Sequence, residues 1–359
     1  MSKRKLASIK RIEEIKSIDG ADLICAYRVD GWWVVDQKDK YKIGDLVVYM
    51  EIDSWCPHTL APFLSKGNEP REFEGVKGER LRSVRLKGQI SQGLLLPITI
   101  HQLNVYEGGV LLSNEDLYQI DEDVTEILGI LKYEKPLPTQ LAGMAKGNFP
   151  SFIPKTDEER VQNLQKEVPK WGEAGLEFSV TEKLDGSSMT VFITTNSDNE
   201  QEFGVCSRNL QLKETDGNSF WVATKKYDLE SKLRNWNTET NRKIAIQFEL
   251  IGPGIQGNKY KLDSIDCKVF RIYDIASCIF LNETETLELC ELFGLTHVPI
   301  LCKMALKNYS IDSLLELAEG KSVLNTKTER EGLVFKCYTD SQPHFKAISN
   351  SFLILNRDD

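Results

Sequence analysis

Residues 181–188 read Thr-Glu-Lys-Leu-Asp-Gly-Ser-Ser, and this stretch decides how the rest of the chain is interpreted. Lys183 stands at the end of a predicted strand, and Asp185-Gly186 predicts a tight turn directly after it. The turn places a long amine beside a carboxylate. By itself the pattern also fits a surface hairpin, because Asp-Gly is a common turn pair. Its meaning therefore depends on the segments around it.

The segments around this turn predict a mixed domain over residues 148–359. Short strands are predicted at 177–181, 189–194, 204–207, 243–251, 269–275 and 332–337. Helices are predicted at 285–293 and 310–319. A capping-box pattern at 156–159 predicts one more helix running through Leu164. This succession indicates an α+β domain with a mostly antiparallel sheet.

The first 100 residues predict a second, smaller domain. Strands rich in β-branched and aromatic residues are expected at 23–35, 46–52, 81–86 and 93–97, separated by Asp-Gly and Gly-Asp turns. Several short strands in this length indicate a five-stranded OB-type β-barrel. Residues 113–131 are acidic and are predicted to be helical from Glu122. We therefore expect a nucleic-acid-binding OB domain with a helical linker over 1–132, and a domain boundary in the proline-containing segment 132–138.

The composition of the 359-residue chain is that of a folded, soluble protein, with 41% hydrophobic and 28% charged residues. We see neither a secretion signal nor an apolar run of the ~18 residues that a membrane span needs. Eight scattered cysteines without a C-x-x-C pair argue against a zinc ribbon and a disulfide framework. They predict free thiols in a reducing intracellular compartment, cytoplasm or nucleus. The net charge of −9 argues only against tight non-specific DNA coating, because phosphate contact depends on local patches.

Two glycine-containing segments imitate nucleotide-binding motifs. Residues 252–257 match G-x-G-x-x-G after a strand. The segment that follows has no helical periodicity, so the helix N-terminus that would bind a pyrophosphate is missing from the prediction. Gly320-Lys321-Ser322 resembles the end of a P-loop, but position 315 is Leu and the segment follows a helix instead of opening one. We reject both as nucleotide-binding sites.

The context of Lys183 contains five further motif-like segments. They follow one another as 206–209 (Cys-Ser-Arg-Asn), 248–256, 270–275, 331–336 (Glu-Gly-Leu-Val-Phe-Lys) and 345–350. Together with Lys-x-Asp-Gly-Ser, these six elements resemble the motifs of the covalent nucleotidyltransferases, in the form found in RNA ligases. Residues 82–97 resemble the OB module of the Naegleria-type and Deinococcus-type RNA ligases, in which an OB domain precedes the nucleotidyltransferase domain. The resemblance covers nearly the whole chain.

This resemblance implies an ATP-dependent, AMP-forming RNA ligase that uses Mg²⁺ or Mn²⁺. Its substrate would be nicked or broken RNA with 3′-hydroxyl and 5′-phosphate ends, sealed through lysyl-AMP and an adenylylated 5′ end. No protein partner is evident, and no membrane association is expected. A lysine with a pKa of about 10.4 is protonated at neutral pH. A metal ion or another cation would therefore have to depress that pKa before the amine can attack phosphorus.

The resemblance also implies the catalytic roles. Lys183 would attack the α-phosphate of ATP, and Lys346 would supply a cation at that phosphate. Three carboxylates would hold the metal ion, directly or through its waters: Asp185, Glu249 and Glu331.

The remaining implied roles concern the nucleotide. Tyr273 would stack on the adenine, and Arg208 would bind a phosphate of the nucleotide or of the RNA 5′ end. Arg160 would orient the leaving pyrophosphate. Glu182 and Lys336 complete the expected nucleotide-binding set.

Each assignment has a plainer alternative. Glu249 and Glu331 are also compatible with solvated strand positions, and Tyr273 with a core position, since aromatic strand residues are usually buried. Arg208 is also compatible with an ordinary surface ion pair. The fifth motif usually carries a second lysine where this chain has Ile348, so either one cation suffices or Lys336 contributes from the neighbouring strand.

A cation-rich stretch lies in the OB-like region. Residues 71–90 contain Arg71, Lys77, Arg80, Arg82, Arg85 and Lys87. One interpretation is a surface that tracks RNA phosphates, with bases stacked on Trp32 or Trp33. The other is a solvated barrel face, because glutamates alternate with the cations.

Four alternatives compete with an RNA ligase, and domain order argues against the first two. A DNA ligase usually has Arg after Lys-x-Asp-Gly, where this chain has Ser187-Ser188, and carries its OB domain after the catalytic domain. A capping guanylyltransferase also expects a C-terminal OB domain. A ligase acting mainly on DNA or on RNA–DNA junctions stays open. A non-catalytic OB-domain nucleic-acid-binding protein is disfavoured, because the lysine and all three carboxylates are present together.

Overall fold

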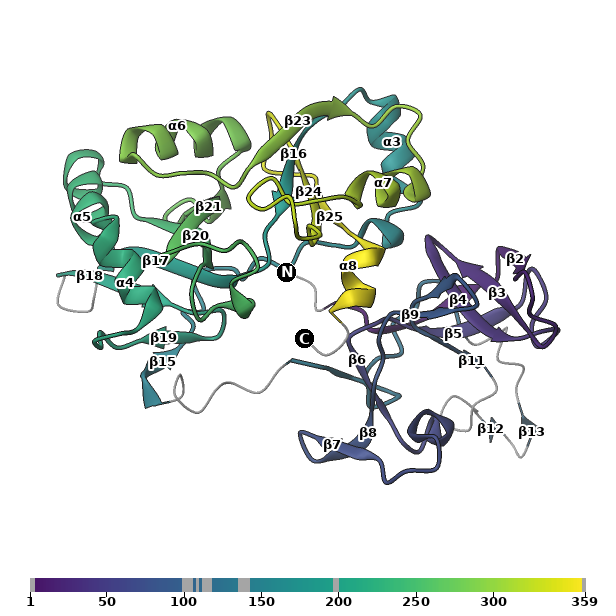
Figure 1. Ribbon diagram of the computed structural model, residues 1–359. Coiled ribbons are helices and arrows are strands. Elements are labelled where there is room, and N and C mark those ends of the chain that lie inside the picture. The colour runs from purple at the N-terminus through teal and green to yellow at the C-terminus, as the bar shows by residue number, and fades with distance from the viewer. Residues whose placement is uncertain are drawn as a thin grey trace. The chain divides into compact units, whose positions relative to one another are not determined.

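The computed structural model describes residues 4–98, 106–107, 110–111, 118–134, 143–195 and 200–356. The chain forms two compact units (Figure 1). The first consists of residues 1–136, with residues 162–165 and 353–359; the second consists of residues 137–161 and 166–352. No helix of the described residues is long and apolar enough to cross a membrane. All eight cysteines are free thiols, as the sequence predicted.

Two three-stranded antiparallel sheets form the centre of the first unit. One has the order β1 (Ala7–Arg11), β5 (Leu46–Met50), β11 (Leu94–Pro97); the other is β2 (Glu14–Ser17), β3 (Ile24–Val29), β4 (Trp32–Gln37). Successive side chains of β5 enter different apolar clusters. Val48 and Met50 pack with Ile9, whereas Val47 and Tyr49 pack in a second cluster. This alternation follows from the two-residue period of a strand.

Smaller sheets complete the first unit. A four-stranded sheet has the order β14 (Leu131–Lys132), β6 (Ser54–Pro57), β8 (Val76–Arg80), β7 (Arg71–Phe73). Two hairpins, β9 (Val84–Leu86) with β10 (Gln89–Ser91) and β12 (Tyr106–Glu107) with β13 (Val110–Leu111), and the 3₁₀-helix η1 (Pro62–Ser65) complete the described elements.

The predicted helix from Glu122 is wrong. Residues 125–129 form turns, and the residues just before them pair with β1 through a bridge between Ser8 and Asp123. The amide of Ile9 donates to the Glu122 carbonyl at 3.0 Å, and the amide of Val124 donates to the Ala7 carbonyl at 3.0 Å. Gly129, at φ 64°, interrupts any helix there. Of the predicted boundary segment, residues 135–138 lie outside the described residues.

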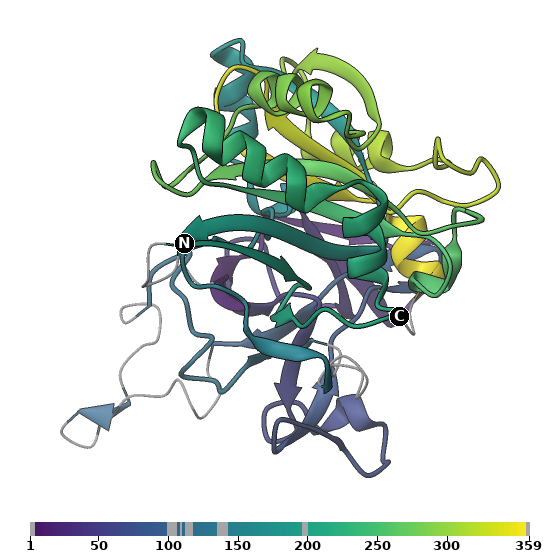
Figure 2. The same cartoon turned by 90° about the vertical axis from the view of Figure 1, so that its left-hand side faces the viewer.

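The second unit is built on two antiparallel sheets. The larger has seven strands in the order β15 (Ala145–Asn148), β19 (Leu210–Leu212), β18 (Gln201–Cys206), β17 (Ser187–Thr195), β20 (Ile244–Ile251), β21 (Asp266–Asp274), β22 (Ile279–Phe280). Three helices cover one of its faces, α4 (Ser219–Lys226), α5 (Leu229–Thr240) and α6 (Glu283–Phe293), and they share one apolar core with it (Figure 2).

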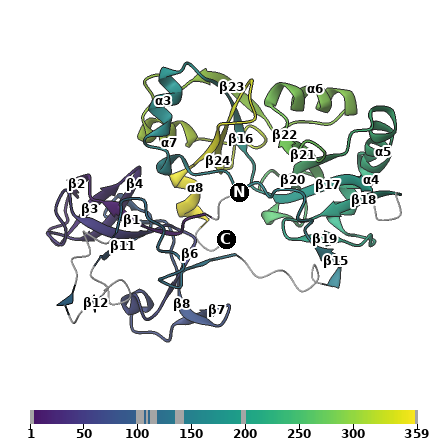
Figure 3. The same cartoon turned by 180° about the vertical axis from the view of Figure 1, so that it is seen from behind.

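The smaller sheet has the order β23 (Ile300–Ala305), β16 (Glu177–Lys183), β24 (Gly332–Cys337), β25 (His344–Ile348). Helices α3 (Glu167–Glu173) and α7 (Ile311–Ala318) lie near this sheet, and α8 (Asn350–Leu355) follows β25 (Figure 3). Two short 3₁₀-helices, η3 (Val161–Asn163) and η4 (Gln256–Asn258), complete the described helices of the chain.

The helices predicted at 285–293 and 310–319 correspond to α6 and α7, which begin at Asn282 and Ser310 capping boxes. The helix predicted through 156–164 is wrong. The carbonyl of Glu159 accepts the amide of Lys346 at 2.8 Å, and Arg160 forms a parallel bridge with the same residue. That backbone is therefore used beside β25, and only η3 follows it. Helices α3, α4, α5 and α8 were not predicted from the sequence.

Candidate active site

A cavity in the second unit is lined from both sheets. The four-stranded sheet contributes residues of β16, β24 and β25, and the seven-stranded sheet contributes residues of β17, β20 and β21. Six predicted site residues line it: Glu182, Lys183, Arg208, Glu249, Lys336 and Lys346.

The Asp185-Gly186 turn carries the chain from one sheet to the other, since Lys183 ends β16 and Ser187 begins β17. Only glycine fits at position 186. A Cβ there would lie 2.3 Å from the Leu250 carbonyl oxygen and 3.1 Å from Cγ of Glu249. This close approach brings the backbone amide of Gly186 to the Glu249 carboxylate, which accepts its hydrogen bond at 2.9 Å. The sequence motif therefore fixes the position of Lys183 against β20.

Lys183 is held as an ammonium in the resting protein. Its Nζ lies 2.7 Å from Oε1 of Glu331, the residue that precedes β24. Burial lowers the pKa of Lys183, but the charges of Glu331 and Glu249 outweigh burial, so the net shift is upward. The main causes of this shift, apart from burial, are carboxylates, and each of them favours the protonated amine. Activation therefore requires that the neighbouring carboxylates be neutralised by another charge.

The two glutamates beside Lys183 are themselves poorly stabilised as anions. Burial raises the pKa of Glu249 to about 8; Lys183 opposes this rise, and Glu331 adds to it. Burial also raises the pKa of Glu331, again against the effect of Lys183. Buried carboxylates that repel each other favour a bound cation. Hard oxygen donors of this kind suit Mg²⁺ or Mn²⁺.

Asp185 has a partner that sequence reasoning missed. Its carboxylate forms an ion pair with Lys259, and its amide donates to the hydroxyl of Tyr260 at 2.7 Å. Within the described residues, no three His, Cys, Asp or Glu side chains gather closely enough to hold an ion by themselves. A metal ion at Asp185, Glu249 and Glu331 would therefore complete its shell with water or phosphate oxygens.

Glu182 lies in the cavity wall, and one of its two carboxylate oxygens already accepts a hydrogen bond. It is 1% exposed, and its Oε2 accepts the amide of Val323 at 2.9 Å. Among the described residues, its Oε1 has no hydrogen-bond partner. A buried carboxylate oxygen without a donor is costly, so this atom predicts a ligand that brings one.

The structure places Phe270, not Tyr273, at the cavity. Gln247 pairs with Arg271 and Phe248 pairs with Val269, so Phe270 is the extra residue of a β-bulge in β21. Tyr273 is 5% exposed and packs in an apolar cluster with Phe192 and Phe280. The expectation that Tyr273 stacks on a base is therefore wrong, and its plainer alternative, a core position, is correct.

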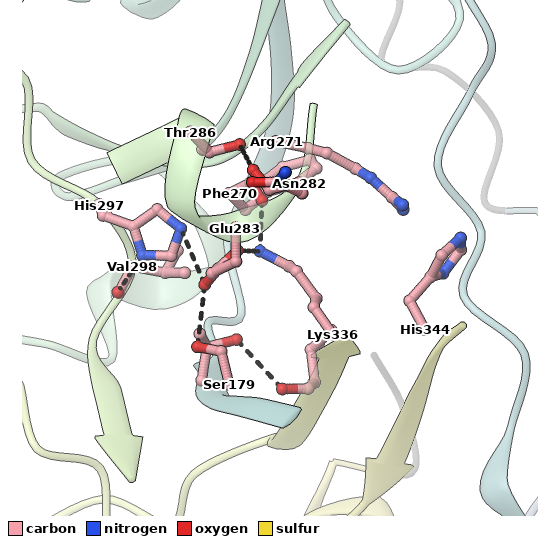
Figure 4. Close-up of polar contacts among 12 residues, drawn as sticks. Ser179, Phe270, Arg271, Asn282, Glu283, Thr286, His297, Val298, Lys336 and His344 are labelled. Atoms are coloured by element: carbon pink, nitrogen blue, oxygen red, sulfur yellow. Dashed lines mark hydrogen bonds and ion pairs between the residues drawn. The ribbon is translucent and has the colours of Figure 1, made fainter. Parts of the chain in front are cut away.

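Lys336 lies in the cavity wall with its charge already balanced. Its Nζ donates to the Phe270 carbonyl at 2.5 Å and to Oε2 of Glu283 at 3.2 Å (Figure 4). Glu283 also accepts from Ser179 at 3.0 Å. Burial and then Lys336 lower the pKa of His297 to about 4, so this neighbour of Glu283 is neutral at pH 7. Lys336 therefore acts here as a fixed donor more than as an uncompensated cation.

Two cations of the cavity lining share one acid. Nζ of Lys346 lies 3.1 Å from Asp157, and the guanidinium of Arg208 lies 3.8 Å from the same carboxylate. Asp157 was not among the predicted site residues. Arg160 is 6% exposed and is absent from the cavity lining. The structure therefore brings Arg208 and Lys346 together and leaves Arg160 outside.

Three of the six cations in residues 71–90 of the first unit are paired with acids. Arg71 pairs with Glu79 at 2.5 Å, Lys77 with Glu69 at 2.7 Å, and Arg80 with Asp53 at 2.7 Å. Trp32 is fully buried and donates to Asn163, so it offers no stacking surface, whereas Trp33 is half-buried beneath Arg28. These contacts favour the solvated-face interpretation of residues 71–90.

Comparison with known proteins agrees with this architecture. A family model described as RNA ligase matches residues 176–348, and an OB-fold domain model matches residues 6–98. The apo form of a mutant Naegleria gruberi RNA ligase is 41% identical, with 100% of both chains covered and a TM-score of 0.86. This chain belongs to the RNA ligase family. The predicted fold, an OB-type barrel followed by a mostly antiparallel nucleotidyltransferase domain, is confirmed.

Two further solved structures of the Naegleria gruberi RNA ligase carry ligands. One contains pyrophosphate, at 42% identity and a TM-score of 0.86; another, a mutant, contains ATP and Mn, at 42% identity and a TM-score of 0.85. Each aligns over 99% of this chain and 100% of its own. No curated protein matches the chain.

Proposed function

We propose that this member of the RNA ligase family is an ATP-dependent enzyme that joins RNA 3′-hydroxyl and 5′-phosphate ends through lysyl-AMP on Lys183. The observation that carries the proposal is the position of Lys183. Its amine ends a strand inside a cavity, is held by Glu331, and lies among carboxylates whose burial favours an added cation. The ATP, AMP, pyrophosphate and Mn found in structures of the Naegleria enzyme support the same choice of substrate and metal.

The cavity walls supply contacts for adenine. Phe270 offers a ring face for stacking, which takes over the role that the sequence gave to Tyr273. The partnerless Oε1 of Glu182 would accept the 6-amino group of adenine. Guanine presents a carbonyl oxygen at that position, so two acceptors would face each other without a proton. Lys336, fixed by Glu283, would donate to the base edge from the other strand.

Adenylylation requires that Lys183 lose its proton. A divalent cation bound by Asp185, Glu249 and Glu331, directly or through water, would supply the positive charge that lowers the pKa of the lysine. Nζ of Lys183 then attacks the α-phosphorus and forms a P–N bond. The bond to the β-phosphate oxygen breaks, and pyrophosphate leaves with that electron pair.

Lys346 and Arg208 would bind phosphate oxygens in place of Asp157. In the second step a 5′-phosphate oxygen attacks the adenylyl phosphorus, the P–N bond breaks, and Lys183 is regenerated. In the third step the 3′-hydroxyl attacks the activated 5′-phosphate. AMP leaves, and the strand is sealed.

The proposal is tested by incubating protein, freed of bound AMP by pyrophosphate, with Mn²⁺ and α-labelled ATP or GTP before denaturing electrophoresis. We expect label from ATP and not from GTP, and its removal by added pyrophosphate. Absence of label from ATP would contradict the proposal. Sealing of nicked duplexes with an RNA or a DNA 3′-hydroxyl strand then defines the end specificity.

A further inference from the structure

The loop that imitates a dinucleotide-binding motif folds over the catalytic turn. Lys259 forms an ion pair with the Asp185 carboxylate. The Tyr260 hydroxyl accepts the Asp185 amide at 2.7 Å, and Nε2 of Gln256 lies 3.4 Å from the Gly186 carbonyl oxygen. Residues 252–262 therefore contact both residues of the turn that positions Lys183.

This loop has its own internal support. The side chain of Asn258 accepts the amide of Leu262 at 3.0 Å and donates to its carbonyl at 2.9 Å. Asn325 donates to the Lys259 carbonyl at 2.8 Å. Tyr260 is 6% exposed and belongs to an apolar cluster with Leu184. The backbone on both sides of Lys259 is thus fixed, and its ammonium reaches Asp185 from a defined position.

The same ammonium has a second partner. Nζ of Lys259 lies 4.7 Å from the ring centroid of Phe352, within the range of a cation–π contact. The side chains of the ion pair are 19% and 16% exposed, so solvent screens it only in part. A lysine that gives up Asp185 would keep the aromatic ring as a partner.

We propose that Lys259 is a built-in counter-ion that neutralises Asp185 until a divalent cation arrives, and that it thereby weakens the metal affinity of the site. The inference rests on the proposed function, which takes Asp185 as part of the metal site. One ammonium in contact with a carboxylate repels a doubly charged ion held by the same group. For charges about 5 Å apart, even water-like screening makes this repulsion worth a factor on the order of ten in affinity. Lys259 is a positioning residue, since its effect acts through Asp185.

The test measures Mn²⁺ binding by the loss of the free-ion electron paramagnetic resonance signal in the presence of AMP. All proteins carry Lys183→Met, so none can be adenylylated. Lys259→Met in this background is expected to bind Mn²⁺ about tenfold more tightly. Lys259→Arg, which keeps the charge, should stay within about twofold of the parent.

Lys303→Met is the matched control. Like Lys259, Lys303 pairs with a carboxylate, that of Glu177 at 2.8 Å, and its Nζ lies 4.0 Å from an aromatic ring centroid, that of Tyr338. Lys303 is not part of the cavity lining. The Lys303→Met substitution removes the same charge as Lys259→Met and should leave the Mn²⁺ affinity unchanged.

Equal or weaker Mn²⁺ binding in Lys259→Met than in its parent would overturn the inference and leave Lys259 as a structural tether. If Lys259→Met does not fold, as judged by thermal unfolding, Lys259→Gln replaces it under the same criterion. Failure of the Lys183→Met parent itself to bind Mn²⁺ would contradict both the inference and the metal site of the proposed function.

Discussion

The Lys183 cavity and residues 71–90 of the first unit are both rich in charge, but their charges are arranged differently. In the surface stretch, Arg71, Lys77 and Arg80 each face a carboxylate. In the cavity, Lys183 is half-buried beside two glutamates that burial makes poor anions. The difference indicates that a functional site is marked by buried charged groups that the protein does not fully neutralise. The number of charges in a stretch of sequence is a poorer guide.

The largest effect is expected from Glu249→Gln. The amide oxygen can still accept the Gly186 amide, so the turn is kept, but the negative charge that would attract a cation is lost. We expect the rate of lysyl-AMP formation to fall by about 10³-fold. Single-turnover labelling with α-labelled ATP measures it. A rate within tenfold of the parent would show that the Glu249 charge matters little for adenylylation, as we expect for the paired charges of residues 71–90.

Gly186→Ala should have the next largest effect. A Cβ 2.3 Å from the Leu250 carbonyl oxygen must displace the turn, and Lys183 with it. We expect labelling to slow by roughly 10²-fold, because small displacements of reacting groups cost about that much. Gly147→Ala is the control, since a Cβ at that position has no atom within 4 Å. Equal rates for the two alanine variants would mean that the close approach at Gly186 is dispensable.

Glu182→Gln tests the cavity at its base-binding end. The oxygen that accepts the Val323 amide must stay an oxygen, so the new NH₂ group would face the ligand. That donor would face the adenine amino group donor to donor, whereas it would donate a hydrogen bond to the guanine carbonyl oxygen. We expect the ratio of ATP to GTP labelling rates to fall at least about tenfold. An unchanged ratio would remove Glu182 from base selection.

The smallest effect is expected from Lys77→Met in the first unit. Lys77 is exposed and paired with Glu69, and such pairs contribute little. The KM for sealing a preadenylylated nicked RNA should change less than about twofold. A much higher KM, with a weaker salt dependence, would instead assign residues 71–90 to phosphate contact and would remove the contrast between the two regions.

Much of this site could be predicted from the sequence, because its chemistry is local. Lys183, Asp185 and Gly186 are adjacent in the chain, and Glu249 and Glu331 stand in recognisable segments. The choice between Phe270 and Tyr273 could not be predicted. It depends on a bulge that redirects one side chain of β21, and a strand's residue pattern does not reveal which residue is the extra one.

The residues that neutralise charges of the site also could not be predicted from the sequence. Lys259 lies 74 residues from Asp185, and Asp157 lies 189 residues from Lys346. Such contacts follow from the tertiary fold and not from spacing. The predicted helix at 122–131 failed for a related reason, since pairing with β1 prevailed over local propensity.

The most direct test of the central claim is mass-spectrometric localisation of AMP after incubation of the intact protein with ATP and Mn²⁺. The predicted result is one adenylylated residue, Lys183, with no adenylylation in Lys183→Met. AMP attached to another residue such as Lys346, or modification that persists in Lys183→Met, would contradict the assignment of Lys183 as the nucleophile.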